Sequence, residues 1–230
     1  MRKNIIITGL PKSGKSTLIK KVIASYEYRV GFVTNEMRVN GSRCGFEIET
    51  QDGEKTILAH TGFTTAYKVS RYYVDINNLE HILPKVTKFK SGDLLYLDEI
   101  GQMELFSRKF KDLANLYLES ENISICSLSK VYRDEFTEMV MNRNDIILVE
   151  ITKDNQDLQT VYVAKLLKKV QKAMRYVSER DRISIKDDGA EIRSDHGLRK
   201  LGKDHSGWSC DCDFYHNHKI CSHVITIESI

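Results

Sequence analysis

The stretch NIIITGLPKSGKSTLIKKVI, residues 4–23, decides the fold. It begins with a short run of β-branched residues that ends at Gly9, and a helical pattern follows from Ser16 to Tyr26. Between the two, GLPKSGKS matches G-x-x-x-x-G-K-[ST] at every fixed position. This phosphate-binding motif requires a strand before it and a helix after it, and both are present. The segment therefore predicts a nucleotide-binding α/β domain.

The residue types of this loop follow from the chemistry of phosphate binding. Gly9 and Gly14 let the backbone curl so that successive N–H groups face phosphate oxygens, and the positive end of the following helix adds to the attraction. Lys15 is expected to reach the β- and γ-phosphates, and the Ser16 hydroxyl to ligate Mg²⁺. The nucleotide-binding residues predicted here are Gly9, Leu10, Pro11, Lys12, Ser13, Gly14, Lys15, Ser16 and Thr17.

A second acidic motif, LLYLDEIG at residues 94–101, complements the loop. Its apolar run predicts a buried strand that delivers Asp98 to the carboxyl edge of the sheet, where ligands of open α/β sheets bind. We expect Asp98 to hold Mg²⁺ through water and Glu99 to polarise the attacking water. The segment predicted to line the nucleotide comprises Leu94, Leu95, Tyr96, Leu97, Asp98, Glu99, Ile100 and Gly101.

Strands alternate with helices over the first two thirds of the chain, which predicts a mostly parallel sheet in a three-layer α/β fold. Pro84 lies in a helical segment, as a kink or a first-turn residue, and Asp52-Gly53 marks a hairpin. Strands are expected at 29–34, 45–50, 55–60, 93–100, 123–129 and 145–152, and helices at 79–89, 106–120 and 131–142. Residues 158–181 predict one long helix with an apolar stripe at Leu158, Val161, Leu166, Val170, Met174 and Val177.

Three separated motifs together resemble a known family. GLPKSGKST, GFVTNEMRVNGSRCGFEI and LYLDEIGQMELFSRKF occur in the order typical of the small nucleoside-triphosphatase family first described from thermophiles, which has a cancer-related human member. The resemblance covers residues 1–160. It implies a RecA-like P-loop fold and slow, Mg²⁺-dependent hydrolysis of ATP, GTP and other nucleoside triphosphates. The second motif is matched at Gly31, Phe32, Thr34, Glu36, Arg38, Gly41 and Arg43.

The chain departs from the pattern of this family at two places. Lys12-Ser13 stands where members often have a glycine, and Gln102 stands where lysine is usual. Neither change removes a group that the chemistry needs, although Gln102 removes a positive charge near the site. Arg38 and Arg43 have two interpretations: at least one meets charge developing on the γ-phosphate, or both steady a glycine-rich turn.

The tail WSCDCDFYHNHKICSHV, residues 208–224, gathers soft metal ligands. C-x-C followed by C-x-H supplies a Cys₃His set, which is common in tetrahedral structural zinc sites and leaves no position open for catalysis. The pattern resembles the SWIM zinc finger over residues 181–228, and the resemblance assigns Cys210, Cys212, Cys221 and His223 as Zn²⁺ ligands. His205, His216 and His218 are then bystanders, with His216 or His218 as a substitute. Cys44 and Cys126 are isolated, so the cysteine usage favours a reducing, cytoplasmic location.

The formal charge of +3 is unevenly distributed. Residues 156–180 carry about +4, whereas residues 181–230 carry about −2, so the tail alone lacks the electrostatic footprint of a nucleic-acid-binding module. Its partner, nucleic acid or protein, stays open. The domains expected are a P-loop domain at 1–157, a basic helix at 158–180 and a β-rich zinc module at 181–230. The sequence contains no run of 18 apolar residues, so it predicts no membrane partner.

Hydrolysis of nucleoside triphosphates is the function that these motifs favour, and three alternatives accompany it. One is a nucleotide or nucleoside kinase, in which the loop from Glu36 to Arg43 holds the acceptor. Another is an ATPase that nucleic acid stimulates and that acts as a switch. The last is a non-catalytic, nucleotide-gated adaptor. Phosphate release without any acceptor separates hydrolysis from strict phosphoryl transfer.

Overall fold

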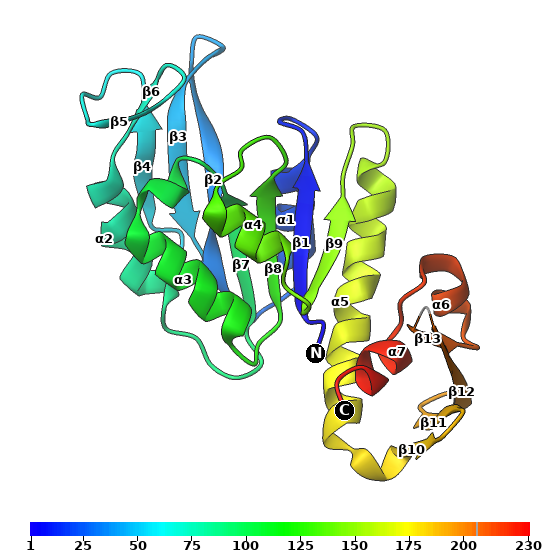
Figure 1. Cartoon of the computed structure of the whole chain (residues 1–230). Coiled ribbons are helices and arrows are strands. Elements are labelled where there is room, and N and C mark those ends of the chain that lie inside the picture. The colour runs from blue at the N-terminus through cyan, green and yellow to red at the C-terminus, as the bar shows by residue number, and fades with distance from the viewer. Residues whose placement is uncertain (206) are drawn as a thin grey trace. The chain divides into compact units, whose positions relative to one another are not determined.

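The computed structural model describes residues 1–205 and 207–230 and contains two compact units (Figure 1). Residues 4–160 form the first unit, and residues 1–3 with 161–230 form the second. Within the described residues, we find no helix that is long and apolar enough to span a membrane.

A nine-stranded sheet organises the first unit, and its parallel part carries the motifs. The parallel strands lie in the order β2-β7-β8-β1-β9, so β8 separates the phosphate-loop strand from the acidic strand. Their bounds are β1 Asn4–Gly9, β2 Arg29–Val39, β7 Leu94–Ile100, β8 Ser124–Ser129 and β9 Ile146–Glu150. Antiparallel strands extend the sheet beyond β2: β3 Ser42–Thr50, β4 Lys55–His60, β5 Tyr67–Val69 and β6 Tyr72–Val74.

Helices cover both faces of this sheet, which confirms the three-layer α/β fold (Figure 1). Every residue of β1 is buried, as expected for a parallel strand covered on both sides. The helices are α1 Lys15–Ile23, α2 Ile76–Val86, α3 Arg108–Glu119 and α4 Glu135–Met141, with a short 3₁₀ turn, η1, at Glu104–Phe106. Side-chain caps set where three of them begin: Asp75 for α2, Ser107 for α3 and Asp134 for α4.

Two expectations about helices require correction. The Asp75 cap starts α2 at Ile76, three residues before the predicted start at Leu79. Pro84 therefore lies in the last turn of the helix and not in its first turn. The apolar stripe expected on the long helix is misplaced at its start: Leu158 is 75% exposed and Val161 is 54% exposed. The face of α5 (Gln156–Ser178) that is buried consists of Val163, Leu166, Leu167, Val170, Ala173 and Tyr176.

The second unit combines most of α5 with a small antiparallel sheet. Strands β10 Ile183–Lys186, β11 Gly189–Ser194, β12 Gly197–Asp204 and β13 Gly207–Cys210 pair in sequence order. A 3₁₀ turn, η2 at Arg180–Arg182, precedes them, and α6 Asp213–His218 and α7 Ser222–Ile227 follow. The second unit has its own hydrophobic core, in which Tyr176 packs with Ala190, Ile192, Leu201 and three cysteines.

Candidate active site

The phosphate loop has the backbone geometry that its glycines and lysine predict. Gly14 caps α1 with φ of +100°, and an added Cβ there would lie 2.6 Å from Cδ of Gln156. Gln156 also donates from Nε2 to the carbonyl of Ser13 at 3.0 Å, so it lies directly against the loop. Lys15 is buried, and its Nζ donates to the Gly9 carbonyl at 3.2 Å. The loop is therefore compact, with an ammonium group inside its curve.

Asp98 lies fully buried beside this loop. Its Oδ1 accepts hydrogen bonds from Oγ of Ser16 at 3.1 Å and from Oγ of Ser127 at 2.6 Å. Its Oδ2 is buried without a hydrogen-bond partner among the described residues, and burial raises the pKa of the carboxyl. A buried, unsatisfied carboxylate oxygen next to a hydroxyl fits Mg²⁺, which prefers oxygen ligands and keeps several waters.

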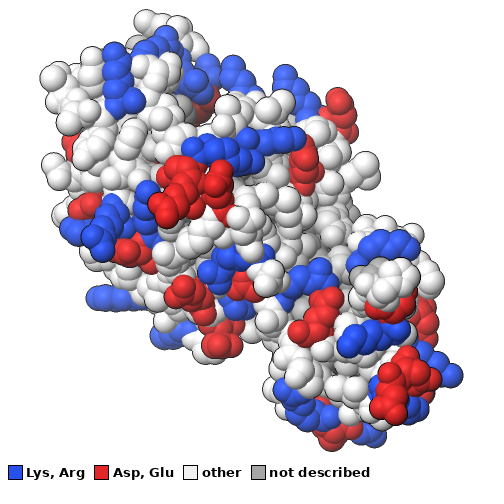
Figure 2. All heavy atoms as spheres, in the orientation of Figure 1, with Lys and Arg blue, Asp and Glu red and all other residues white. Residues whose placement is uncertain are grey.

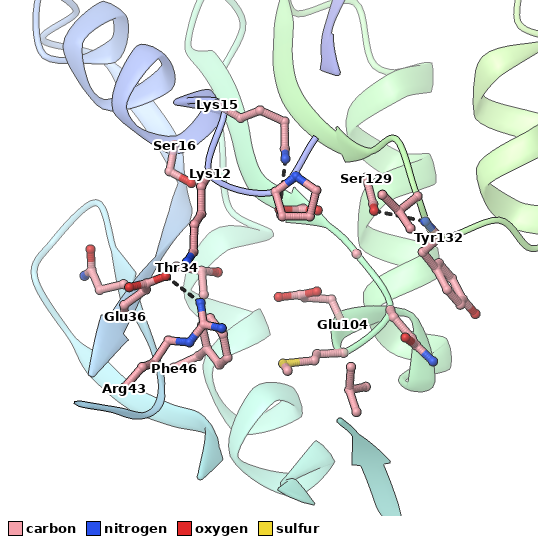
Figure 3. Close-up of a pocket in the computed structure, with 18 of the residues that line it drawn as sticks. Lys12, Lys15, Ser16, Thr34, Glu36, Arg43, Phe46, Glu104, Ser129 and Tyr132 are labelled. Atoms are coloured by element: carbon pink, nitrogen blue, oxygen red, sulfur yellow. Dashed lines mark hydrogen bonds and ion pairs between the residues drawn. The ribbon is translucent and has the colours of Figure 1, made fainter. Parts of the chain in front are cut away.

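Two further carboxyl groups line the same cavity. Glu99 is 3.8 Å from Lys15 Nζ, and burial raises its pKa despite that cation. Glu104, on η1, is only 4% exposed and points into the cavity (Figure 3). Burial, followed by the charges of Glu99 and Asp98, raises the pKa of Glu104 to about 8. Burial therefore favours the protonated form of the Glu104 carboxyl.

The cavity is about 930 Å³ in volume and reaches from the phosphate loop to β3 and β6. Arg43 lines it, with its guanidinium held by the Glu36 carboxylate at 2.6 Å and by the Tyr72 hydroxyl at 2.9 Å. Arg38 also binds Glu36, but it is 52% exposed and is not among the residues that line the cavity. The structure therefore brings Arg43, and not Arg38, to the cavity wall.

Several residues expected to line the nucleotide lie elsewhere. Leu94, Leu95, Tyr96 and Leu97 are between 0 and 3% exposed, because both faces of β7 are covered, and Ile100 is fully buried as well. Their part is to hold Asp98 and Glu99 in place. Leu10 is 60% exposed and does not line the cavity, whereas the loop residues that do are Pro11, Lys12, Gly14, Lys15, Ser16 and Thr17.

Some residues of the site were not identified from the sequence. Ser127 reaches Asp98 because β8 lies next to β7, and only the strand order reveals this. Gln156 follows β9, the neighbour of β1 on its other side. Glu104 stands six residues after Asp98, within the DEIGQMEL stretch, so its position in that motif was an available signal.

The cysteine cluster of the second unit fits a tetrahedral metal site. Cys210, Cys212, Cys221 and His223 are all buried, and their ligand atoms lie within 4.8 Å of one another. Nδ1 of His223 is 3.5 Å from Sγ of Cys210 and 3.8 Å from Sγ of Cys221. Zinc bonds of about 2.3 Å to sulfur and 2.0 Å to nitrogen place tetrahedral ligands roughly 3.5 to 3.8 Å apart. The cluster therefore suggests a zinc site.

A phosphate loop on β1, a buried acid on β7 and a strand between them define the chain as a P-loop nucleoside triphosphatase. It belongs to the NTPase family, whose model matches residues 4–164. The nucleoside-triphosphatase THEP1 of Thermotoga sp. (strain RQ2) is 40% identical over 166 residues, which are 71% of this chain and 95% of that protein. The THEP1 of Aquifex aeolicus is 33% identical over 177 residues, 72% of this chain and 99% of that protein.

Two solved structures resemble the same region. The crystal structure of THEP1 from Aquifex aeolicus superposes with a TM-score of 0.67 at 30% identity, covering 72% of this chain and 99% of that one. The solution structure of a human cancer-related nucleoside triphosphatase gives a TM-score of 0.64 at 27% identity, covering 72% and 97%. Each match covers 72% of this chain, so more than a quarter of the chain lies outside the region that resembles these two structures.

Proposed function

We propose that the first unit hydrolyses nucleoside triphosphates to diphosphate and phosphate in a Mg²⁺-dependent reaction with broad base specificity. The observation that carries this is the contact between Ser16 and Asp98, which joins the phosphate loop to the acidic strand at 3.1 Å. Ser16 and Asp98 would hold the Mg²⁺, which neutralises phosphate charge when bound. Lys15 binds the phosphates, and Glu99 orients the attacking water and accepts its proton.

Arg43 is the arginine that this proposal assigns to catalysis. It lies on the cavity wall with its guanidinium oriented by two partners, whereas Arg38 is largely solvated. A guanidinium that meets charge developing on the γ-phosphate stabilises the transition state. Lys12, left-handed at φ of +64°, adds a further cation at the cavity.

Phosphate release measured over ATP, GTP, CTP and UTP, with Mg²⁺ and with EDTA, tests this function. We expect release with all four nucleotides, loss of release in EDTA, and at least about a hundredfold loss in Glu99→Gln. Glu121→Gln, an exposed carboxyl outside the cavity, is the matched control and should retain activity. Equal activity of Glu99→Gln and the wild type would contradict the role of Glu99.

The second unit is, in this proposal, a module folded around one structural Zn²⁺ held by Cys210, Cys212, Cys221 and His223. Elemental analysis should find one zinc per chain, and Cys212→Ser should lose it. Cys44→Ser, remote in sequence from the cluster, is the control. Full zinc content in Cys212→Ser would show that this ligand set is wrong.

The same unit serves as a recognition module, and single-stranded nucleic acid is the partner that its surface favours over protein. It contains 15 Lys and Arg against 10 Asp and Glu. Lysines lie over three of its partly exposed aromatic rings: Lys169 over Phe214 at 4.9 Å, Lys203 over Trp208 at 5.4 Å and Lys219 over Tyr215 at 5.7 Å. Aromatic rings beside cations bind stacked bases. The face shown in Figure 2 intersperses both signs of charge.

Anisotropy of a labelled oligothymidine, titrated at several salt concentrations, tests this assignment. Lys169→Ala should weaken binding and reduce the salt slope by about one, whereas Lys186→Ala, which loses a lysine paired with Glu191, should change it less. If the oligonucleotide raises phosphate release, hydrolysis is coupled to binding. An unchanged anisotropy at low salt would favour a protein partner instead.

A further inference from the structure

The connection between β9 and α5 lies against both fixed glycines of the phosphate loop. An ideal Cβ at Gly9 would lie 2.4 Å from the backbone oxygen of Ile151. An ideal Cβ at Gly14 would lie between 2.6 and 3.0 Å from three side-chain atoms of Gln156. Gln156 is the first residue of α5, and it belongs with the loop to the unit formed by residues 4–160. The two glycines therefore leave room for this connection as well as letting the backbone curl.

The backbone on both sides of Gln156 is held by hydrogen bonds. The N–H of Ile151 donates to the carbonyl of Thr8 at 2.8 Å, which continues the pairing of β1 with β9 by one residue. Within α5, Oγ1 of Thr160 donates to the carbonyl of Gln156 at 2.8 Å. Because its backbone is fixed in this way, the Gln156 side chain loses little freedom when it contacts the loop.

The carbonyl of Ser13 depends on this side chain for a hydrogen bond. Nε2 of Gln156 donates to it at 3.0 Å. Ser13 is only 4% exposed, and among the described residues we find no backbone N–H that donates to its carbonyl. A buried carbonyl without a donor costs free energy comparable with a lost hydrogen bond. Gln156 therefore favours the one orientation of this peptide group in which the carbonyl faces its carboxamide.

The same contact sets the direction of a donor in the phosphate loop. In a planar trans peptide, the C=O of one residue and the N–H of the next point in opposite directions. The peptide between Ser13 and Gly14 is trans, so the N–H of Gly14 points away from Gln156. Gly14 is the residue before α1, where backbone N–H groups are available to bind phosphate oxygens.

We propose that Gln156 is a positioning residue for nucleotide binding: its carboxamide holds the Ser13 carbonyl and thereby orients the Gly14 N–H toward a phosphate oxygen. The inference rests on the proposed function of the same site, and within it on the binding of the nucleotide rather than on its hydrolysis. Gln156 itself acts through the peptide group that it orients.

Calorimetric titration of the full-length protein with ADP and Mg²⁺ tests this role. Gln156→Met keeps the length of the side chain and removes the donor, so the Kd for ADP should rise about three- to tenfold, the effect of losing one hydrogen bond. The KM for ATP should rise by a similar factor and kcat should fall by less, because the phosphate contact is made in both the ground and transition states. Gln159→Met is the same substitution three residues along α5, outside the cavity lining, and should change neither constant. Equal affinities of Gln156→Met and the wild type would overturn the proposal.

The amide of Gly14 can be observed directly by NMR. Labelling with [¹³C′]serine and [¹⁵N]glycine selects the amides of the three Ser-Gly pairs in the sequence, and the signal that is absent from Ser13→Ala is that of Gly14. Saturating ADP should move the Gly14 amide proton downfield in the wild type and in Gln159→Met, and by less in Gln156→Met. A lower affinity of Gln156→Met with an unchanged Gly14 shift would assign Gln156 a structural role and overturn the positioning role.

The positioning role and the proposed hydrolysis fail separately. Phosphate release by the wild type, with ADP affinity unchanged in Gln156→Met, removes the positioning role and leaves the hydrolase. Binding of ADP that depends on Gln156, without phosphate release, supports the positioning role and removes hydrolysis. If the wild type does not bind ADP, both proposals fail together.

Discussion

Gly31 is the first residue of the motif GFVTNEMRVNGSRCGFEI, and its replacement by alanine should lower both the stability and the activity of the protein. An ideal Cβ at Gly31 would lie 1.8 Å from the backbone oxygen of Tyr96, where ordinary Cβ contacts begin at 3.4 Å. Because the neighbour is backbone, β2 and β7 must separate by most of that difference. A ladder hydrogen bond of about 2.9 Å does not survive such a displacement.

The loss of stability in Gly31→Ala can be estimated from the β2–β7 hydrogen bonds that the clash breaks. The β2–β7 ladder joins five residue pairs, from Arg29 with Leu94 to Val33 with Asp98. Losing two or three of its hydrogen bonds at about 1 kcal/mol each, plus the strain of φ at +154°, gives a cost of roughly 3–5 kcal/mol. Since Asp98 ends that ladder, we also expect phosphate release to fall more than about tenfold.

Urea unfolding followed by circular dichroism measures this cost, with Gly53→Ala as the matched control. Gly53 also has positive φ, +83°, but nothing lies within 4 Å of an added Cβ. Backbone strain alone should cost that variant about 1–2 kcal/mol. If Gly31→Ala unfolds at the same urea concentration as Gly53→Ala, the clash with Tyr96 does not lower the stability beyond ordinary backbone strain.

Three further substitutions are informative. Ser127→Ala removes a 2.6 Å hydrogen bond to Asp98 and should lower phosphate release about tenfold, with an unchanged circular dichroism spectrum. Asp134→Ala removes the capping box of α4 and should cost about 1 kcal/mol in urea unfolding. Hydrogen bonding to Arg175 lowers the pKa of Asp195 to about 2. The ionised Asp195 stabilises the fold above its unfolded pKa of about 3.9, and this stabilisation is lost as the pH falls toward 2. Asp195→Asn should therefore flatten the pH dependence of the free energy of unfolding over this range by up to about 1 kcal/mol. An identical pH profile in wild type and variant would contradict this expectation.

The parts of the fold predicted from the sequence are those whose signals are local. The phosphate loop, the strand that carries Asp98 and the hairpin at Asp52-Gly53 all have short motifs or continuous apolar runs. Strands β5, β6, β12 and β13 were missed, because β5, β6 and β13 are only three or four residues long and β12 is rich in charged residues. The face of α5 was misassigned at Leu158 and Val161 for a related reason, since burial is set by what packs against a helix.

The residues of the candidate site likewise fall into two groups: those that a local motif predicts and those that only the fold identifies. Lys15, Ser16, Asp98 and Glu99 belong to motifs whose spacing encodes chemistry, and the structure places Ser16 and Asp98 in contact. Arg38 and Arg43 match the same motif equally well, and only the fold separates them. Ser127 reaches Asp98 because β8 lies next to β7, and no local sequence pattern predicts that strand order.

The central position of β1 has a consequence for how the protein is made. Asn4 pairs with Ser124 on one side and with Ile146 on the other, so the first strand to leave the ribosome waits longest for its neighbours. The hairpin of β3 and β4 can form at once, whereas the phosphate loop stays without its sheet until β9 has emerged. Long-range parallel pairing is slow and leaves apolar strands exposed meanwhile. We therefore expect nucleotide affinity to arise only after β8 and β9 have been synthesised.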